Sequence, residues 1–329
     1  MTALALAATR WYQRHARDLP WRAPGTGAWP ILVSEVMLQQ TPVTRVMPVW
    51  RDWSERWPEP AALAAEPPGE AIRAWGRLGY PRRALRLHQC ATALVTCHRG
   101  RVPRSLPDLL ALPGVGAYTA RAVAAFAFRE RHPVVDTNVR RMVARCVAGE
   151  PDAGQATTTA DLAATAALLP GSGPRAAAAS AAFMELGAVV CTARAPRCGR
   201  CPLAGFCAWR ATGRDLPAGP TRRPQRYAGT DRQARGALLA VLRDADGPVP
   251  RTRLDPVWPD PVQRERALVG LLADGLIQWT GDGTYTLPTD HPDPGSARSP
   301  GPGPGPAPGK NGPGPGQVRG AHPRGPWTG

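Results

Sequence analysis

The stretch from Leu112 to Arg141 constrains the fold of this chain more than any other. It begins with a short turn, Leu-Pro-Gly-Val-Gly, between two segments of helical pattern, the second of which ends near Arg129. Glycines tolerate the backbone angles that a tight turn requires and allow other groups to approach closely. A lone acid, Asp136, then precedes another helical segment. The stretch predicts two short helices joined by a hairpin turn, followed by a helix with a carboxylate at its N-terminus.

The chain divides by composition into four parts. Residues 1–207 have the apolar periodicity of helices and no convincing strand alternation, which predicts an all-α domain. Residues 208–229 are polar, basic and interrupted by prolines, as is typical of a linker. Residues 230–288 contain two helical patterns followed by a hairpin pattern, which predicts a small winged-helix-like unit. Residues 289–329 repeat Pro and Gly, cannot bury a core and are predicted to be a disordered tail.

The charge of the chain favours a polyanionic partner. Basic residues (41) outnumber acidic ones (25), the net charge is +16, and every Lys or Arg except Lys310 is an arginine. Arginine makes planar, bidentate contacts with phosphate, so this balance indicates nucleic acid. No apolar run is long enough to span a bilayer, and no basic segment precedes the apolar start. We therefore expect no membrane partner and a location in a bacterial-type cytosol, associated with the nucleoid.

Four of the seven cysteines lie close together, because Cys191, Cys198, Cys201 and Cys207 follow the spacing C-x6-C-x2-C-x5-C. In a cytosolic protein this density is more typical of a metal centre than of disulfides. Structural zinc usually takes two C-x2-C pairs across a longer gap, whereas this segment has one such pair. All-cysteine ligation also suits an iron–sulfur cluster. The spacing alone leaves zinc and a cluster at nearly even odds.

Two carboxyl groups are candidates for chemistry. Glu35 is the one charged residue of a segment, Trp29–Thr41, that is apolar on almost its whole circumference. A carboxyl group in such a place resists ionisation, so its pKa rises and it can act as an acid near neutral pH. The alternative is a glutamate that pairs with one of the many arginines. Asp136 is placed as a helix N-cap and keeps its charge. One protonated and one ionised carboxyl group is the pairing that glycosyl-bond chemistry uses.

The hairpin turn is a candidate DNA contact. The amide groups of Gly114, Val115 and Gly116 can point at a phosphate oxygen from the start of the following helix. Such a contact grips the DNA backbone without reading its sequence. Because any helix pair needs a turn, the motif is weak by itself, but Arg121 and Arg129 on the following helix strengthen it.

Together these residues resemble the helix-hairpin-helix DNA glycosylase superfamily, and most closely its adenine DNA glycosylases. The likeness covers roughly residues 8–215, and its six motifs occur in the family's order. They are RDLPWR (Arg17–Arg22), SEVMLQQT (Ser34–Thr41), RLGY (Arg77–Tyr80), LPGVGAYTA, VVDTNVRR and the cysteine loop. The resemblance implies an all-α, two-lobed helix-hairpin-helix glycosylase fold with the active site between the lobes. It also implies a 4Fe–4S cluster in the cysteine loop at 191–207, which settles the choice left open by the spacing.

The resemblance further implies that adenine is extruded from the duplex into a pocket. Glu35 matches the glutamate that protonates the departing adenine and assists the incoming water, and Asp136 matches the aspartate that stabilises the oxocarbenium-like sugar. Tyr118 and Asn138 match polar neighbours that support these two. The remaining matches are the strip lining the adenine pocket, Arg17, Leu19, Trp21 and Arg22, and the residues that probe the lesion pair or wedge into the stack, Gln40, Thr41, Leu78 and Tyr80.

Tyr118 stands where the endonuclease III branch has a lysine that forms a Schiff base and cuts the strand. That chemistry needs a free amine, and residues 1–309 offer none except the N-terminus. We therefore expect a monofunctional DNA N-glycosylase of base excision repair that leaves an abasic site. Its expected partner is double-stranded DNA with adenine opposite 8-oxoguanine or guanine, and we expect it to be a monomer.

Two features depart from the family pattern. Many adenine glycosylases recognise 8-oxoguanine with a domain related to nucleotide-pyrophosphate hydrolases, for which residues 230–288 are too short, and Pro81 replaces an aromatic residue often found after Tyr80. The preference for 8-oxoguanine over guanine thus stays open, as does DNA binding by the winged-helix-like unit through Gln263–Arg266. A thymine or uracil mismatch glycosylase and a non-catalytic DNA damage-binding protein are the alternative functions.

Overall fold

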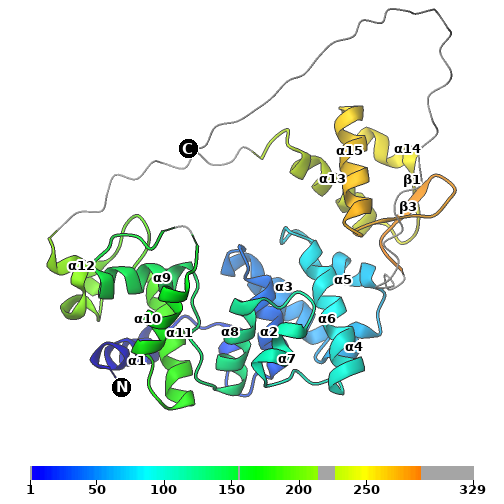
Figure 1. Cartoon of the computed structure of the whole chain (residues 1–329). Coiled ribbons are helices and arrows are strands. Elements are labelled where there is room, and N and C mark those ends of the chain that lie inside the picture. The colour runs from blue at the N-terminus through cyan, green and yellow to red at the C-terminus, as the bar shows by residue number, and fades with distance from the viewer. Residues whose placement is uncertain (1, 155, 214–226, 290–329) are drawn as a thin grey trace, which may run out of the picture. The chain divides into compact units, whose positions relative to one another are not determined.

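The computed structural model describes residues 2–154, 156–213 and 227–289. Over these ranges the chain is mainly helical, as predicted, with one small sheet near its C-terminal end (Figure 1). None of the described helices is both long and apolar enough to cross a membrane. The predicted disordered tail beyond Thr289 and most of the predicted linker lie outside the described residues.

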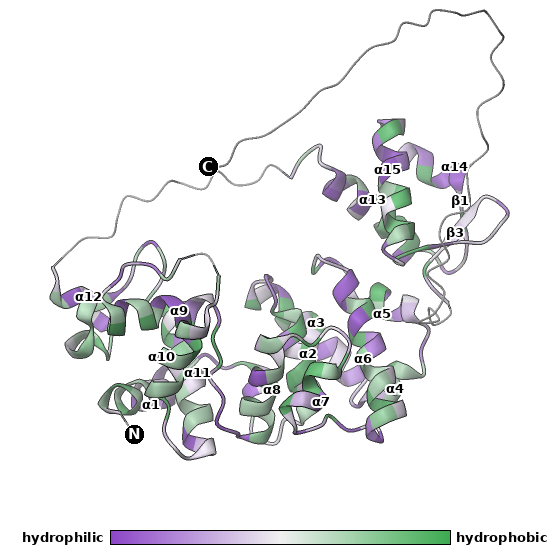
Figure 2. Cartoon of the chain, viewed as in Figure 1, coloured by the Kyte–Doolittle hydropathy of each residue, from purple (hydrophilic) through white to green (hydrophobic). Residues whose placement is uncertain are grey.

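A first lobe is built around α2 (Ala28–Met37), which is buried along almost its whole length, as its composition predicts. Apolar residues are concentrated on α2 and the helices around it (Figure 2). Trp53 packs edge-on against Trp57 and Trp75, with ring centroids 4.8 and 5.5 Å apart. The other elements of this lobe are η1 (Pro20–Arg22), α3 (Val43–Arg56), α4 (Pro60–Ala64), α5 (Pro68–Trp75), α6 (Arg82–His98), α7 (Leu106–Ala111) and α8 (Ala117–Phe128).

A second lobe combines the N-terminal helix α1 (Ala3–His15) with the segment that follows α8, and it has a separate hydrophobic core. Its central helix, α11 (Gly173–Val189), is rich in alanine, so its neighbours approach closely. At Gly187 a Cβ atom would lie 2.5 Å from the carbonyl oxygen of Asn138. The other elements are α9 (Thr137–Val143), the π-helix η2 (Ala144–Ala148), α10 (Thr159–Leu168), η3 (Cys198–Arg200), η4 (Ala204–Phe206) and α12 (Ala208–Ala211).

Helix α12 lies where the sequence predicts the first residues of a linker. The side chain of Trp209 explains the difference, because it is buried and stacks under the guanidinium of Arg145, 5.1 Å from its ring centroid. One buried aromatic residue keeps this segment attached to the second lobe although its neighbours are polar.

The predicted hairpin is present between α7 and α8. Ser105 accepts a hydrogen bond from the N–H of Asp108 at 3.5 Å and so caps α7. Gly114 has φ +76°, a left-handed conformation that glycine adopts readily. A Cβ atom there would also lie 2.8 Å from the Cβ of Arg86. This turn therefore requires glycine both for its backbone angle and for its contact with α6.

The C-terminal unit contains the two predicted helices, α13 (Asp231–Arg243) and α15 (Pro261–Ala273). The predicted hairpin is formed by β2 (Gln278–Trp279) and β3 (Thr284–Thr286), which pair antiparallel. The sequence did not reveal β1 (Val249–Pro250), which pairs with β3 and gives the strand order β1-β3-β2. A two-residue strand that ends in proline has no alternation to detect. The unit also contains α14 (Arg251–Leu254) and η5 (Asp255–Val257).

The helix start proposed above as a DNA contact is engaged within its own unit. Gln263 donates to Asp231 at 2.8 Å and accepts from the indole of Trp258 at 2.6 Å. Arg266 forms a bidentate pair with Asp231, both bonds being 2.7 Å long. In addition, the N–H of Gly69 in α5 donates to the carbonyl of Pro288 at 2.7 Å. The Gly69–Pro288 bond connects the unit to the first lobe, and the side chains of Gln263 and Arg266 are already engaged within the unit.

Candidate active site

Glu35 lies in the middle of α2, and only 6% of the residue is exposed. Burial raises the pKa of Glu35 to about 7, and the charge of Asp136 acts in the same direction. A hydrogen bond from Tyr118 and the charge of Arg22 oppose this shift only in part. Within the described ranges Glu35 forms no ion pair, so the alternative of a glutamate neutralised by a neighbouring arginine does not hold. The carboxyl group is therefore partly protonated at neutral pH.

Tyr118 lies in the first turn of α8, where its hydroxyl group hydrogen-bonds Glu35. Burial raises the pKa of Tyr118, and the carboxylates of Glu35 and Asp136 raise it further. The hydroxyl group thus keeps its proton and donates it in the hydrogen bond. A tyrosine in this place can orient Glu35 but cannot form a Schiff base.

Asp136 is the N-cap of α9, as predicted. Its Oδ1 accepts from the N–H of Val139 at 2.7 Å, and its Oδ2 accepts from Nδ2 of Asn138 at 2.9 Å. Asn138 in turn accepts from Arg141 at 2.9 Å, and Arg141 donates to the carbonyl of Cys191 at 2.7 Å. A continuous series of hydrogen bonds therefore runs from Asp136 to the start of the cysteine loop.

The structure brings three of the four predicted catalytic residues together from separate elements. Glu35 and Tyr118 come from the first lobe, whereas Asp136 comes from the second. Asn138 contacts Asp136 and completes the set. Glu35, which can give up a proton near neutral pH, thus lies near the carboxylate of Asp136, which accepts two hydrogen bonds from N–H donors of the second lobe. This arrangement is suited to cleaving a glycosyl bond.

The raised pKa of Glu35 predicts a pH-dependent stability difference. Glu35 ionises near 4.5 when unfolded and at about 7 when folded, so burial of its charge lowers the free energy of unfolding progressively between these pH values. Glu35→Gln removes this cost, on the order of 3 kcal/mol above the folded pKa. We expect the variant to melt several degrees above the wild type at about pH 8, with a smaller difference at about pH 5.5. Thermal melting followed by circular dichroism measures this, and a difference that does not grow with pH would contradict it.

A buried acid that the sequence did not reveal organises two of the predicted pocket residues. Glu185 of α11 is fully buried and accepts from Nε and Nη2 of Arg17 at 2.6 and 3.0 Å, and from Nη1 of Arg22 at 2.8 Å. Burial alone would raise the pKa of Glu185, but the two arginines lower it. The charge of Arg22 also acts to lower the pKa of Glu35. No local pattern marks Glu185, because its partners lie more than 160 residues away in sequence.

The other predicted site residues occupy different environments. Leu19 and Trp21 are buried in the core of the first lobe, where Trp21 packs edge-on against Trp50. The four residues predicted to probe the lesion pair differ in exposure: Gln40 and Tyr80 are exposed, whereas Thr41 and Leu78 are buried. Gly114 and Gly116 are exposed at the hairpin turn, with Val115 buried between them.

The four cysteines of the predicted cluster loop line one cavity in the second lobe, together with Cys146 and Arg145. Nη1 of Arg145 lies 3.5 Å from Sγ of Cys191, so a cation lies beside one of these sulfur atoms. In the part of the chain that the structure describes, no three His, Cys, Asp or Glu residues stand close enough to hold a single metal ion. A 4Fe–4S cluster takes one thiolate for each of its four irons, so four cysteines that line one cavity fit such a cluster.

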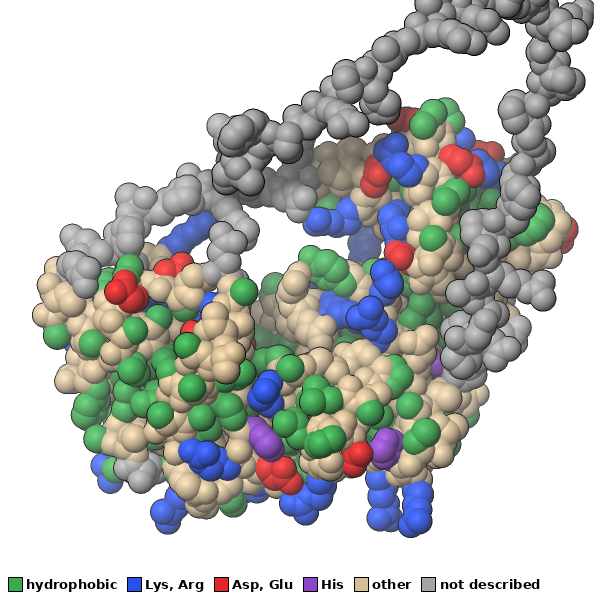
Figure 3. Space-filling view, in the orientation of Figure 1, with side chains coloured by type: hydrophobic (Ala, Val, Ile, Leu, Met, Phe, Trp, Pro, Cys, Tyr) green, Lys and Arg blue, Asp and Glu red, His purple; other side chains and the backbone are tan. Residues whose placement is uncertain are grey.

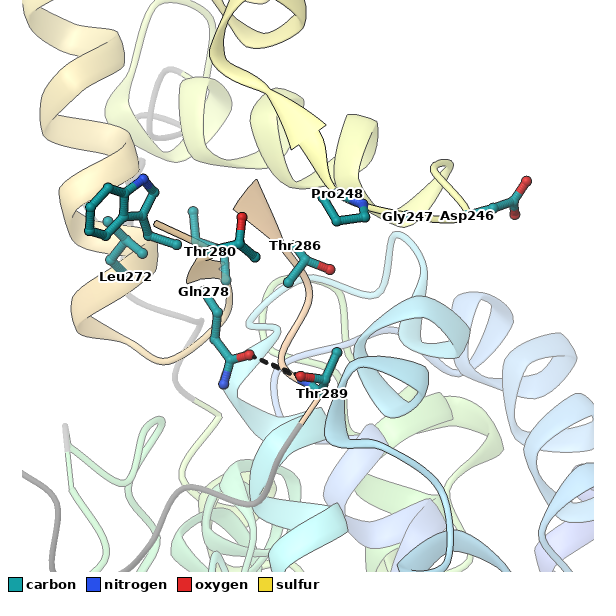
Figure 4. A pocket seen from close by; sticks show the side chains of 10 residues that line it. Asp246, Gly247, Pro248, Leu272, Gln278, Thr280, Thr286 and Thr289 are labelled. Carbon is teal, nitrogen blue, oxygen red and sulfur yellow. Dashed lines mark hydrogen bonds between the residues drawn. The ribbon is translucent and has the colours of Figure 1, made fainter. Parts of the chain in front are cut away.

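Positive charge is distributed widely over the visible surface (Figure 3), and a second cavity lies in the C-terminal unit. Arginine side chains are spread over the visible face of the helical part rather than gathered in one patch (Figure 3). An open cavity of about 730 Å³ lies within the C-terminal unit and is lined by residues between Asp246 and Thr289 (Figure 4). Gln278 crosses it to accept from the N–H of Thr289 at 3.2 Å. The cavity contains none of the predicted catalytic residues.

Comparison with known proteins shows the family of the chain. The profile of the HhH-GPD superfamily of base excision DNA repair proteins matches residues 33–165, and that of the iron–sulfur binding domain of endonuclease III matches residues 191–207. The chain is thus a helix-hairpin-helix DNA glycosylase of the class that carries a 4Fe–4S cluster. A thermostable thymine-DNA glycosylase of known structure superposes with a TM-score of 0.57 at 25% identity, covering 63% of this chain and 95% of that one.

Two curated relatives define the family more narrowly. The adenine DNA glycosylase of Mycolicibacterium smegmatis is 60% identical over 279 residues, which is 84% of this chain and 93% of the relative. That of Mycobacterium tuberculosis is 58% identical over 279 residues, covering 84% and 91% of the two chains. The chain belongs to the adenine DNA glycosylase family.

Proposed function

We propose that this protein excises adenine mispaired with 8-oxoguanine or guanine in double-stranded DNA during base excision repair. The observation that carries the proposal is the pairing of Glu35, whose pKa is about 7, with Asp136 on the opposite lobe. Family membership supports adenine as the base. We propose that the protein acts as a monomer in the cytosol, where its net positive charge favours association with DNA.

The residues of the site divide the reaction between them. The adenine leaves the duplex and enters the site by base flipping. Glu35 gives its proton to the adenine as the bond to the sugar breaks, and the side chain of Asp136 stabilises the positive charge that develops on the sugar ring. Glu35, now a carboxylate, accepts a proton from the water that attacks the sugar. Tyr118 and Asn138 hold the two carboxyl groups in place.

A panel of duplexes tests this function. We expect alkali to cleave the strand after incubation with duplexes that carry adenine opposite 8-oxoguanine or guanine, but not with T·G or U·G duplexes. Cleavage of the T·G or U·G strand would indicate a thymine or uracil mismatch glycosylase instead. Specific binding to the adenine mispairs without any cleavage would indicate a damage-binding protein.

The same reaction tests the proposed absence of lyase chemistry. Because Tyr118 has no amine, the strand should stay intact until alkali is added, and borohydride should trap no covalent complex at an internal residue. The matched variant is Tyr118→Lys, which supplies an amine at this position. A trapped wild-type complex would overturn the proposal that the product is an abasic site.

We also propose Cys191, Cys198, Cys201 and Cys207 as the cluster ligands. When bound, the cluster joins the ends of this loop through iron–thiolate bonds. Replacing Cys201 with serine should abolish the visible absorbance of the cluster and lower the iron content of the purified protein. Cys146→Ser is the matched control, because Cys146 lines the same cavity without belonging to the motif. Loss of iron in both variants would contradict the assignment.

A further inference from the structure

Arg83 is the second residue of α6 and belongs to none of the sequence motifs described above. Only 8% of the residue is exposed. Its guanidinium group contacts five oxygen atoms. Nη1 donates to the carbonyls of Val36, Met37 and Gln39 at 3.0, 2.9 and 2.6 Å, and Nη2 donates to Oγ1 of Thr41 at 2.9 Å and to the carbonyl of Gly79 at 3.0 Å.

These acceptors belong to three separate segments. Two are carbonyls in the last turn of α2, where backbone oxygens have no partner within the helix and where a cation also interacts favourably with the helix dipole. Gln39 and Thr41 belong to the loop that follows α2, and Gly79 belongs to the loop between α5 and α6. One side chain thus joins the helix that carries Glu35 to both loops predicted to probe the lesion pair.

Both loops contain a backbone conformation that needs support. Gln40, with φ +55°, lies between Gln39 and Thr41, both of which Arg83 contacts. Tyr80, with φ +49°, follows Gly79, whose carbonyl also accepts from Arg83. Residues with a Cβ atom disfavour this left-handed region and keep it only where the surroundings hold them there. The guanidinium group provides such a restraint on one or both sides of each strained residue.

Arg83 is held without a carboxylate. In the described ranges no acidic side chain forms an ion pair with it, and its charge lies over the rings of Trp75 and Tyr80, 5.1 and 5.4 Å from their centroids. Burial lowers the pKa of Arg83 to about 10, which leaves it charged at neutral pH. Trp75 reinforces the same loop, because its Nε1 donates to the carbonyl of Gly79 at 2.9 Å. A buried cation without a counter-charge is costly, so its presence is best explained by the geometry it imposes.

We propose that Arg83 is a positioning residue that holds the two lesion-probing loops in register with helix α2, so that the identity of the opposite base influences the placement of Glu35. The inference rests on the proposed function. The two loops would then read the opposite base from within the helix-hairpin-helix domain. By restraining both loops, Arg83 would also fix the direction of the exposed side chains of Gln40 and Tyr80.

Arg83→Lys tests the proposal best, since lysine keeps the charge but is a point donor that cannot span five acceptors. We expect the ratio of single-turnover excision rates, A·8-oxoguanine over A·G, to fall about tenfold in this variant because small displacements of reacting groups have large effects on rate. Arg83→Met should behave similarly. Arg51→Met, which removes an exposed arginine of α3, is the control for loss of one positive charge and should leave the ratio unchanged.

Amide hydrogen exchange gives a second measurement that does not depend on activity. Exchange of peptides covering residues 37–42 and 77–81 should become faster in Arg83→Lys, while peptides from α11 should not change. Circular dichroism and cluster absorbance establish that each variant is folded. A wild-type rate ratio or unchanged loop exchange in a folded Arg83→Lys would overturn the proposal. A wild type that shows no adenine excision would refute the proposed function, and the exchange result would still decide the role of Arg83.

Discussion

Glu35→Gln should reduce the single-turnover rate of adenine excision by about two to four orders of magnitude, the usual contribution of a general acid. Glutamine preserves the shape of the side chain and can accept the hydrogen bond of Tyr118, but it has no proton of comparable acidity to give to the departing base. Binding to the mispaired duplex, measured by gel shift, should change little. A rate within tenfold of the wild type would show that the proton comes from another group.

The pH profile gives an independent check on this assignment. Because the pKa of Glu35 is about 7, the acid form is lost as pH rises through that value, and the excision rate of the wild type should fall over the same range. The residual activity of Glu35→Gln should lack this fall. A wild-type rate that is flat across neutral pH would place the rate-limiting proton elsewhere.

Asp136→Asn should reduce excision by about a hundredfold or more while the protein stays folded. Asparagine is as good an N-cap as aspartate, so the bond to the N–H of Val139 can persist. What is lost is the negative charge beside the sugar, and electrostatic stabilisation of this kind contributes two to three orders of magnitude. Single-turnover kinetics at saturating protein, compared with the melting temperature, separate the two effects.

Asp136→Ala provides the contrast. It removes the cap as well as the charge and should cost about 1 kcal/mol of stability in addition to the activity. If Asp136→Asn were nearly as active as the wild type and only Asp136→Ala were impaired, Asp136 would be a structural cap without a role in the chemistry.

The parts of this molecule that are encoded locally could be predicted from the sequence. The apolar circumference of the segment around Glu35 indicated a buried helix, and the position of Asp136 before a helical run indicated an N-cap; the structure has both. The hairpin turn could be predicted because it contains Gly114, whose φ is positive. Each of these features depends on neighbours within a few residues, so the pattern of the sequence contains it.

The parts that depend on distant contacts could not be predicted. Glu185 is one acid in an alanine-rich helix, and only the folded chain brings it to Arg17 and Arg22. Arg83 is one of forty arginines, and its acceptors are mostly backbone carbonyls, which no sequence pattern reports. Strand β1 is too short to show alternation, and Trp209 alone distinguishes α12 from a linker.

The close contact at Gly187 links the packing of α11 against α9 to the position of Asp136. A single methyl group there would press on Asn138, the residue that donates to Asp136, without emptying either hydrophobic core. Because the atoms met first are backbone atoms of α9, Gly187→Ala would have to displace α9 from α11, and we expect it to lower both the melting temperature and the rate of adenine excision.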